Sequence, residues 1–161
     1  MSAGPAGPDA TLIGVLNRDW DRPSTSDWAA VLAHLPLFAH VRKRHLRHIA
    51  GLAEIREFEP GDVVIQKGDA ADGFYLILGG HASVVEPKQA RRLKTGDYFG
   101  EMALLDGEPR SATVVAVGEL QTMRLPREPF IRLLEQEPSI SIAMLTELGN
   151  RIRRLEKSPV A

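Results

Sequence analysis

The chain has 161 residues, a formal net charge of −1 at pH 7 and no cysteine. A chain of this length fits a single domain that buries about two thirds of its unfolded surface without covalent cross-links. The lack of cysteine excludes disulfides and thiolate metal sites. The near-neutral charge argues against a strongly basic nucleic-acid-binding surface, and no apolar run approaches the roughly 20 residues of a membrane-spanning helix.

Residues 1–24 are predicted to form a flexible segment, because they carry several prolines and small or polar residues. Their one apolar run, residues 12–16, could dock onto a folded domain. The segment has neither the basic start nor the apolar core of a signal peptide. We therefore expect a cytoplasmic protein with one folded domain over residues 25–161.

Residues 26–53 are predicted to form the N-terminal helices of this domain. Residues 26–34 have the pattern of a capped helix, and Pro36 ends it. A second helix is indicated by an apolar stripe with the spacing i, i+3, i+4, i+7, which consists of Leu46, Ile49, Ala50 and Ala53.

Residues 54–125 change to short β-branched and aromatic runs punctuated by glycine and aspartate. Gly79 and Gly80 lie between two of these runs and are read as a turn. Turns at such spacing predict an α+β, mainly β fold built on an antiparallel jelly-roll barrel. The predicted strands are 55–58, 62–66, 73–78, 81–86, 90–94, 111–117 and 120–125.

Residues 98–114 hold the most informative pattern of the chain. Gly100 permits a close backbone approach and residues 101–105 are good helix formers, so a short helix is predicted to begin there. The N–H groups of its first turn suit a phosphate oxygen. Residues 106–109 end the helix with turn chemistry, and Arg110 follows with a planar fork that can clamp a phosphate.

Glu101 adds an acceptor-only carboxylate beside this anion site. It can accept a hydrogen bond from a ribose hydroxyl or from Arg110. The alternative is a surface ion pair between Glu101 and Arg110 around a turn, which would contribute about 0–1 kcal/mol.

Residues 127–157 are predicted to form the C-terminal helices, with Pro129 in the first turn of one and Pro138 at the start of the other. The last helix has apolar residues at heptad spacing, but over only two heptads. This seam either packs against the barrel of its own chain or supports a homodimer. It consists of Leu145, Leu148, Ile152 and Leu155.

The stretch 98–114 closely resembles the phosphate-binding cassette of the cyclic nucleotide-binding domain family. The resemblance covers about residues 30–157, because the motifs upstream also occur in the order that the family has them. These motifs lie at residues 35–38, 58–61, 66–69, 74–77, 80 and 96–97.

The resemblance implies a role for each matching residue. In the family the glycine and glutamate contact the ribose, the next amides and the arginine hold the cyclic phosphate, and the residue after the arginine helps read phosphate or base. Carried over by position, with Phe99 directly before them, the ligand-binding residues are Phe99, Gly100, Glu101, Met102, Ala103, Arg110, Ser111 and Ala112.

The family's last helix swings over the pocket when nucleotide binds. Arg151 is our first choice for a contact from that helix to the ligand, ahead of Arg153 and Arg154. A solvated basic last turn, which the helix dipole favours, explains each of the three equally well.

Catalysis and metal binding are not expected. The four histidines between residues 34 and 48 lack the spacing of a helical metal pair with an acidic ligand. Ser111 has no sequence-evident His–Asp partner, and the cassette offers neither a metal nor a general base for hydrolysing a nucleotide. We therefore predict no enzyme and no cofactor other than the nucleotide ligand.

The resemblance implies a cyclic nucleotide receptor that changes conformation through its C-terminal helix and signals to a separate partner protein. Cyclic AMP is favoured because the family's bacterial members usually bind it, while the Ser111 hydroxyl leaves cyclic GMP open. Few residues follow Lys157, so we expect no DNA-binding domain. Two alternatives remain: an interaction protein that binds no nucleotide, and a fragment that regulates a catalytic or channel domain on a larger polypeptide.

Overall fold

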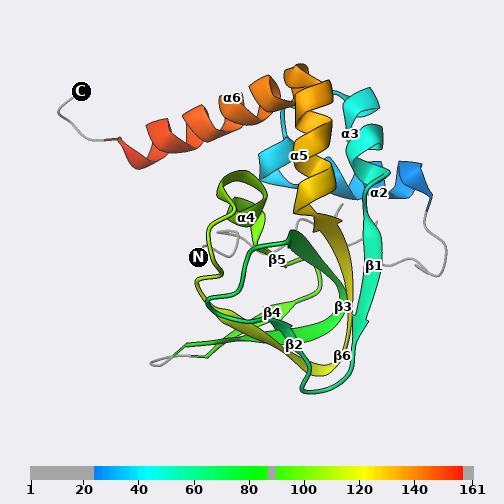
Figure 1. Cartoon of the computed structure of the whole chain (residues 1–161), viewed down its shortest axis with the longest axis vertical. Helices are drawn as coiled ribbons and strands as arrows, with labels where there is room; N and C mark the ends of the chain where they lie inside the picture. The colour runs from blue at the N-terminus through cyan, green and yellow to red at the C-terminus, as the bar shows by residue number, and fades with distance from the viewer. Residues whose placement is uncertain (1–23, 87–89, 158–161) are drawn as a thin grey trace.

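A computed structural model describes residues 24–86 and 90–157 of the chain. An antiparallel β-barrel carries a layer of helices at one end (Figure 1). The predicted segment 1–24 and its apolar run therefore lie, except for Ser24, outside the described residues. The strands are β1 (Glu54–Phe58), β2 (Val63–Ile65), β3 (Gly73–Val85), β4 (Arg91–Lys94), β5 (Tyr98–Phe99) and β6 (Thr113–Pro126). The expected mainly β fold with flanking helices is confirmed.

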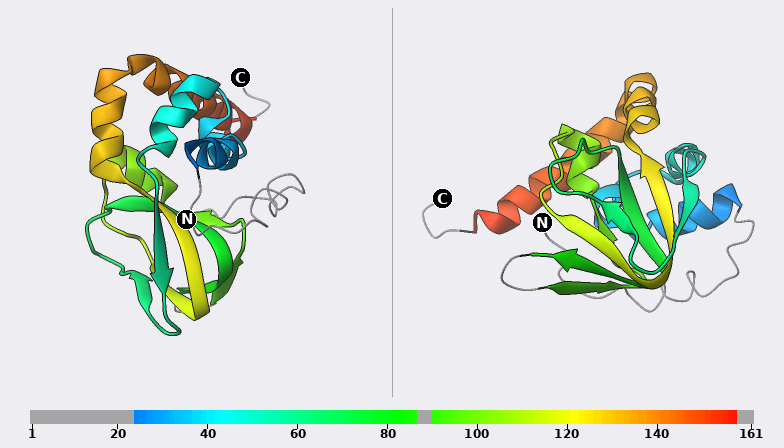
Figure 2. Two further views of the ribbon diagram at one scale, coloured as in Figure 1. Left: turned by 90° about the vertical axis from the view of Figure 1, so that its right-hand side faces the viewer. Right: turned by 60° about the horizontal axis from the view of Figure 1, so that its bottom comes forward.

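The two long strands, β3 and β6, form the centre of the sheet. They pair antiparallel from Gly73 opposite Pro126 to Val85 opposite Thr113. β1 and β2 pair with β6, while β4 and β5 pair with β3. Each long strand thus pairs with two short strands. Figure 2 shows that the long strands bend, so that the sheet curves around the barrel interior.

The predicted turn at Gly79 and Gly80 is wrong. Both glycines lie inside β3, and the register between β3 and β6 shifts at this point. Gly80 has a φ of +93°, and a Cβ there would collide with the carbonyl oxygen of Glu119. The glycine pair therefore provides a bulge and a close strand approach, a use of glycine that a sequence pattern shares with turns.

The two predicted strands 111–117 and 120–125 are likewise one continuous strand, β6. Gly118 lies at their junction with a φ of +79°. The two-residue strand β5 was not predicted, because it is too short to show a period.

The helices are α2 (Thr25–Leu32), the 3-10 helix η1 (Pro36–Phe38), α3 (Lys43–Ala50), α4 (Glu101–Asp106), α5 (Arg127–Gln136) and α6 (Pro138–Leu155). Ser24 begins α2 through a capping box with Asp27. Phe38 of η1 and Phe130 of α5 meet edge to face, with ring centroids 6.1 Å apart. This aromatic pair joins the N-terminal to the C-terminal helices.

Helix α6 is anchored through its first half. Ile140 and Met144 are buried in the core under the helical layer. Of the predicted heptad seam only Leu148 packs against this core, whereas Leu145, Ile152 and Leu155 are exposed. The seam therefore packs against the chain's own domain at Leu148 alone, and the end of α6 projects from the molecule in Figure 1.

No helix within residues 24–86 and 90–157 is both long and apolar enough to cross a membrane.

Candidate functional site

A cavity of about 220 Å³ lies between α4 and the loop that leads into β6. All predicted ligand-binding residues except Phe99 and Arg151 line it. The fold thus brings most of the predicted set to one place. The lining residues are Ile65, Gly100, Glu101, Met102, Ala103, Asp106, Glu108, Pro109, Arg110, Ser111 and Ala112.

Gly100 opens α4 as predicted. Its φ of +80° is a left-handed conformation that suits glycine. Its carbonyl accepts a hydrogen bond from the amide of Ala103, at 3.1 Å. A Cβ on Gly100 would lie 2.5 Å from Nη1 of Arg110. The missing side chain therefore leaves room for the arginine head beside the first turn of α4.

Arg110 is buried at the end of the cavity, with 4% of its side chain exposed. Nη2 donates to the carbonyl oxygen of Gly73 at 2.7 Å and to Oδ1 of Asp72 at 3.0 Å. Nη1 is buried and has no hydrogen-bond partner within the described part of the chain. Buried donors normally have a hydrogen-bond acceptor. An acceptor such as a phosphate oxygen could therefore bind at Nη1.

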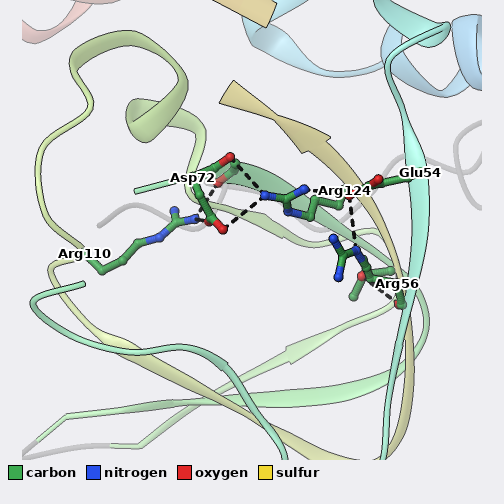
Figure 3. Close-up of polar contacts among 7 residues, drawn as sticks. Glu54, Arg56, Asp72, Arg110 and Arg124 are labelled. Carbon is green, nitrogen blue, oxygen red and sulfur yellow. Dashed lines mark hydrogen bonds and ion pairs between the residues drawn. The ribbon is translucent and has the colours of Figure 1, made fainter. Parts of the chain in front are cut away.

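The alternative of a surface ion pair between Glu101 and Arg110 is not what the structure shows. Both residues are buried, and the carboxylate that binds Arg110 belongs to Asp72 (Figure 3). The reason is the start of β3, which places Asp72 beside an arginine 38 residues away in sequence. Glu101 thereby keeps its oxygens for another donor.

Arg151 of α6 reaches Glu101, with Nη2 3.7 Å from Oε2. Burial raises the pKa of the Glu101 carboxyl above its ordinary value, and the charge of Arg151 partly opposes this effect. Arg151 also lies 3.6 Å from Glu147, to which Arg154 donates at 3.2 Å. In this structure Arg151 thus contacts Glu101 of the cassette, while its contact with a ligand stays a prediction.

Two predicted residues differ in their exposure. Phe99 is 2% exposed and stacks on Tyr75 with ring centroids 5.2 Å apart, so it supports the barrel wall behind the cavity. Met102 is 52% exposed on α4 and stands at the cavity rim.

Asp72, Arg124 and Glu54 form a polar network behind Arg110 that the sequence did not predict. Arg124 donates to Glu54 at 2.6 Å and to Asp72 at 3.1 Å (Figure 3). Burial acts to raise the pKa of Asp72, but Arg124 and Arg110 together outweigh it and hold that pKa below its ordinary value. No local pattern could reveal the network, because its members come from segments far apart in the sequence.

Two of the four histidines between residues 34 and 48 lie beside carboxylates. His48 lies 2.7 Å from Glu137, and His40 lies 3.3 Å from Glu147. Across residues 24–86 and 90–157, no group of three or more His, Cys, Asp and Glu side chains could hold a metal ion.

Comparison with known proteins finds the same module. The family model "Cyclic nucleotide-binding domain" matches residues 55–137. The cAMP-dependent protein kinase regulatory subunit of Emericella nidulans is 37% identical over 129 residues, which are 77% of this chain and 30% of that protein. The subunit of the same name from Mucor circinelloides is 39% identical over 77% of this chain and 32% of its own length.

Solved structures agree on the fold. The N-terminal domain of a transcriptional regulator from Streptomyces coelicolor has a TM-score of 0.66 at 23% identity, covering 79% of this chain and 93% of its own. The regulatory domain of Toxoplasma gondii PKA, solved with cAMP, has a TM-score of 0.60 at 24% identity, covering 78% of this chain and 50% of that chain.

This chain spans about a third of the length of the curated relatives named above. The family model nevertheless matches more than half of the chain, from the first barrel strand to the end of α5. The chain therefore belongs to the cyclic nucleotide-binding domain family.

Proposed function

We propose that this chain is a cyclic nucleotide receptor that binds cyclic AMP, changes the position of α6 on binding, and signals to a separate partner. The observation that carries the proposal is Nη1 of Arg110, a buried cationic donor without a partner in the described residues, beside the first turn of α4. A cyclic phosphate supplies the charge and the acceptors that this place requires.

Several of the predicted residues then have a physical task in binding. Arg110 and the first-turn amides of α4 hold the phosphate, and Glu101 accepts from the ribose hydroxyl because a carboxylate offers acceptors only. Ser111 can donate to the phosphate or to the base. These roles rest on the common cavity of the residues and on the family's motif.

Signalling is proposed to run through Glu101 and α6. In this structure Arg151 of α6 contacts Glu101. A ribose that takes over the Glu101 carboxylate competes with this contact, and the nucleotide can shift α6 only as far as it binds the two positions with different affinity. The exposed end of α6 is then the surface that a partner, or a second copy of this chain, can sense.

A regulatory role without catalysis agrees with the relatives, which are named regulatory subunits. Because the chain spans only part of their length, it also fits a receptor module that controls a further domain or subunit. A cytoplasmic location stays a prediction.

Calorimetric titration tests the proposal. The wild-type protein should bind cyclic AMP, and Arg110→Ala should weaken binding by about 2–5 kcal/mol, because a phosphate charge is left without its partner. That is a loss of roughly thirtyfold or more. Arg132→Ala is the matched control, since Arg132 is an exposed arginine on α5 whose partner is Glu128.

The measurement also separates the alternatives. Absence of binding by the folded wild-type protein would favour an interaction protein without nucleotide. Conversion of the titrant to the linear monophosphate would reveal an enzyme. Unchanged affinity in Arg110→Ala would contradict the assignment of the phosphate site.

A further inference from the structure

Helix α3 presents a basic face to the outside of the molecule. Arg47 lies four residues after Lys43 and three after Arg44, so these side chains project from one side of the helix. Arg42 stands beside them at the N-cap, and all four side chains are exposed. None of the four has a hydrogen bond or an ion pair within residues 24–86 and 90–157. These four side chains are called the basic face of α3 below.

The basic face works against the stability of its own helix. The first turn of a helix carries the positive end of the helix dipole, which repels cations. α3 has no acidic residue in that turn, and Arg42 makes no capping hydrogen bond through its side chain. The neighbouring helix α2 has the favourable arrangement, with Ser24 as its cap and the acidic Asp27 in its first turn. The chain thus leaves a repulsion at α3 that an anion from outside would relieve.

Helix α3 also contacts the junction between α5 and α6. Nδ1 of His48 on α3 lies 2.7 Å from a carboxylate oxygen of Glu137. Glu137 is both the last cap of α5 and the first cap of α6. Figure 1 shows α3 beside α5 in the helical layer. A change in the position of α6 therefore acts on the helix that carries the basic face.

The chemistry of the basic face favours carboxylates of a protein over a membrane surface. Three of its four cations are arginines, whose planar fork pairs with a carboxylate through two parallel hydrogen bonds. A basic helix that binds a membrane inserts its apolar side into the lipid. The apolar side of α3, with Leu46 and Ile49, is instead buried in the core under the helical layer. No large apolar side chain of α3 is exposed to serve as an anchor.

A nucleic acid matches the basic face less well than a short acidic segment does. Duplex DNA carries a charge about every 1.7 Å along its whole length. The basic face extends only over the eight residues of α3, roughly 12 Å, on a chain with a net charge of −1. A few carboxylates on one protein segment suit both the extent and the sign of this patch.

We propose that the basic face of α3 is a docking surface for an acidic segment, rich in Asp and Glu, of the protein to which this chain signals. Docking itself needs no nucleotide. Its role in signalling rests on the proposed function, because the His48–Glu137 contact would link the docked segment to the position of α6.

Fluorescence anisotropy with a labelled octaglutamate peptide tests the docking surface. The wild-type protein should bind the peptide. The double variant Arg44→Glu, Arg47→Glu should bind it about tenfold or more weakly, because like charges then face each other. Glutamate at residue 44 removes a cation from the first turn of α3, so this variant should melt at the same temperature as the wild type or higher.

The matched control is the double variant Arg92→Glu, Lys94→Glu. Both residues are exposed on β4, away from the helical layer, and the change in net charge is the same. This control should bind the peptide within about twofold of the wild type at moderate ionic strength, where distant charges are screened. An equal loss in the two double variants, or no binding by the wild-type protein, would overturn the docking surface.

Two further probes separate the kinds of partner. The same proteins are tested with phosphatidylserine vesicles by sedimentation and with a labelled DNA duplex by anisotropy. Neither probe should bind in a way that depends on Arg44 and Arg47. Binding of vesicles or DNA that is lost in the α3 variant, and is tighter than that of the peptide, would overturn the assignment to an acidic protein segment.

Addition of saturating cyclic AMP tests the role in signalling. The peptide affinity of the wild-type protein should change by about fivefold or more, a typical coupling between two sites. An unchanged affinity would overturn the link to α6. If the protein binds the peptide through α3 but binds no nucleotide, the proposed function fails and the docking surface stands. If it binds cyclic AMP through Arg110 but not the peptide, the docking surface fails alone.

Discussion

The head of Arg110 fits beside α4 because Gly100 has no side chain. Gly100 adopts a φ of +80°, and a Cβ on it would lie 2.5 Å from the unpartnered Nη1 of Arg110. At the scale of single residues, the geometry of the candidate phosphate site therefore depends on this one glycine.

Gly100→Ala should weaken cyclic AMP binding by about tenfold or more, because the new methyl group displaces the arginine head that pairs with the phosphate. Gly61→Ala is the matched control. Gly61 has a φ of +86°, but a Cβ there would meet nothing within 4 Å. Both variants should lose about 1–2 kcal/mol of unfolding free energy, the cost of a left-handed conformation for a residue with a Cβ.

Titration calorimetry and urea unfolding of both variants give the two quantities. Equal nucleotide affinity in the Gly100 and Gly61 variants would show that Arg110 does not need the space beside α4.

At the scale of elements, α6 has two halves with different surroundings. Ile140 in the first half is completely buried, while Ile152 in the second half is 54% exposed. The first half holds the helix on the domain, and the second half contributes the contact between Arg151 and Glu101. Such a division suits a helix whose end changes position while its start stays packed.

Ile140→Ala should lower the unfolding free energy by about 2–5 kcal/mol, because it removes buried methyl groups and leaves a cavity. Ile152→Ala deletes the same atoms from an exposed position and should change stability by no more than about 0.5 kcal/mol. Urea unfolding of the two variants on one helix is a matched comparison. A large loss in Ile152→Ala would mean that the second half of α6 is buried in solution, for example in a dimer.

At the scale of the whole molecule, one charge network joins β1, the start of β3, β6 and the cassette. Glu54 and Asp72 both contact Arg124, and Asp72 also contacts Arg110. Burial acts to raise the pKa of both carboxyls, but the arginines together outweigh it, so both pKa values lie below the ordinary 4.5 and 3.8. These three ion pairs therefore stabilise the folded state only while the two carboxyls are ionised.

The unfolding free energy should therefore fall toward acid pH. Below the ordinary pKa values the unfolded chain takes up protons before the folded one, so the unfolding free energy falls as the pH drops from about 4.5 through the lowered values. The double variant Glu54→Gln, Asp72→Asn should show a flatter decline over this pH range. Glu86→Gln, at an exposed position after β3, is the control and should keep the wild-type slope.

Urea unfolding at a series of pH values measures these slopes. A double variant with the wild-type slope would show that Glu54 and Asp72 do not stabilise the folded chain through ionisation.

The sequence correctly predicted the features that depend only on neighbouring residues. The helix at Gly100, its end before Arg110, the stripe of Leu46 and Ile49, and the start of α6 at Pro138 depend on neighbours within a few residues. For that reason the cassette was recognised in full. The exposure of Phe99 and the partner of Glu101 could not be predicted, because both depend on residues far away in the chain.

The sequence by itself determined the type of fold and the motif of the candidate phosphate site, since these follow from local backbone preferences and from the order of side chains. Only the tertiary structure decided that Gly79 and Gly80 continue a strand and that Asp72 binds Arg110. Both depend on contacts between segments that lie far apart in the sequence, and strand register is one result of such contacts. The local sequence therefore predicts the candidate phosphate site, while the packing of the barrel and helices decides which side chains surround it.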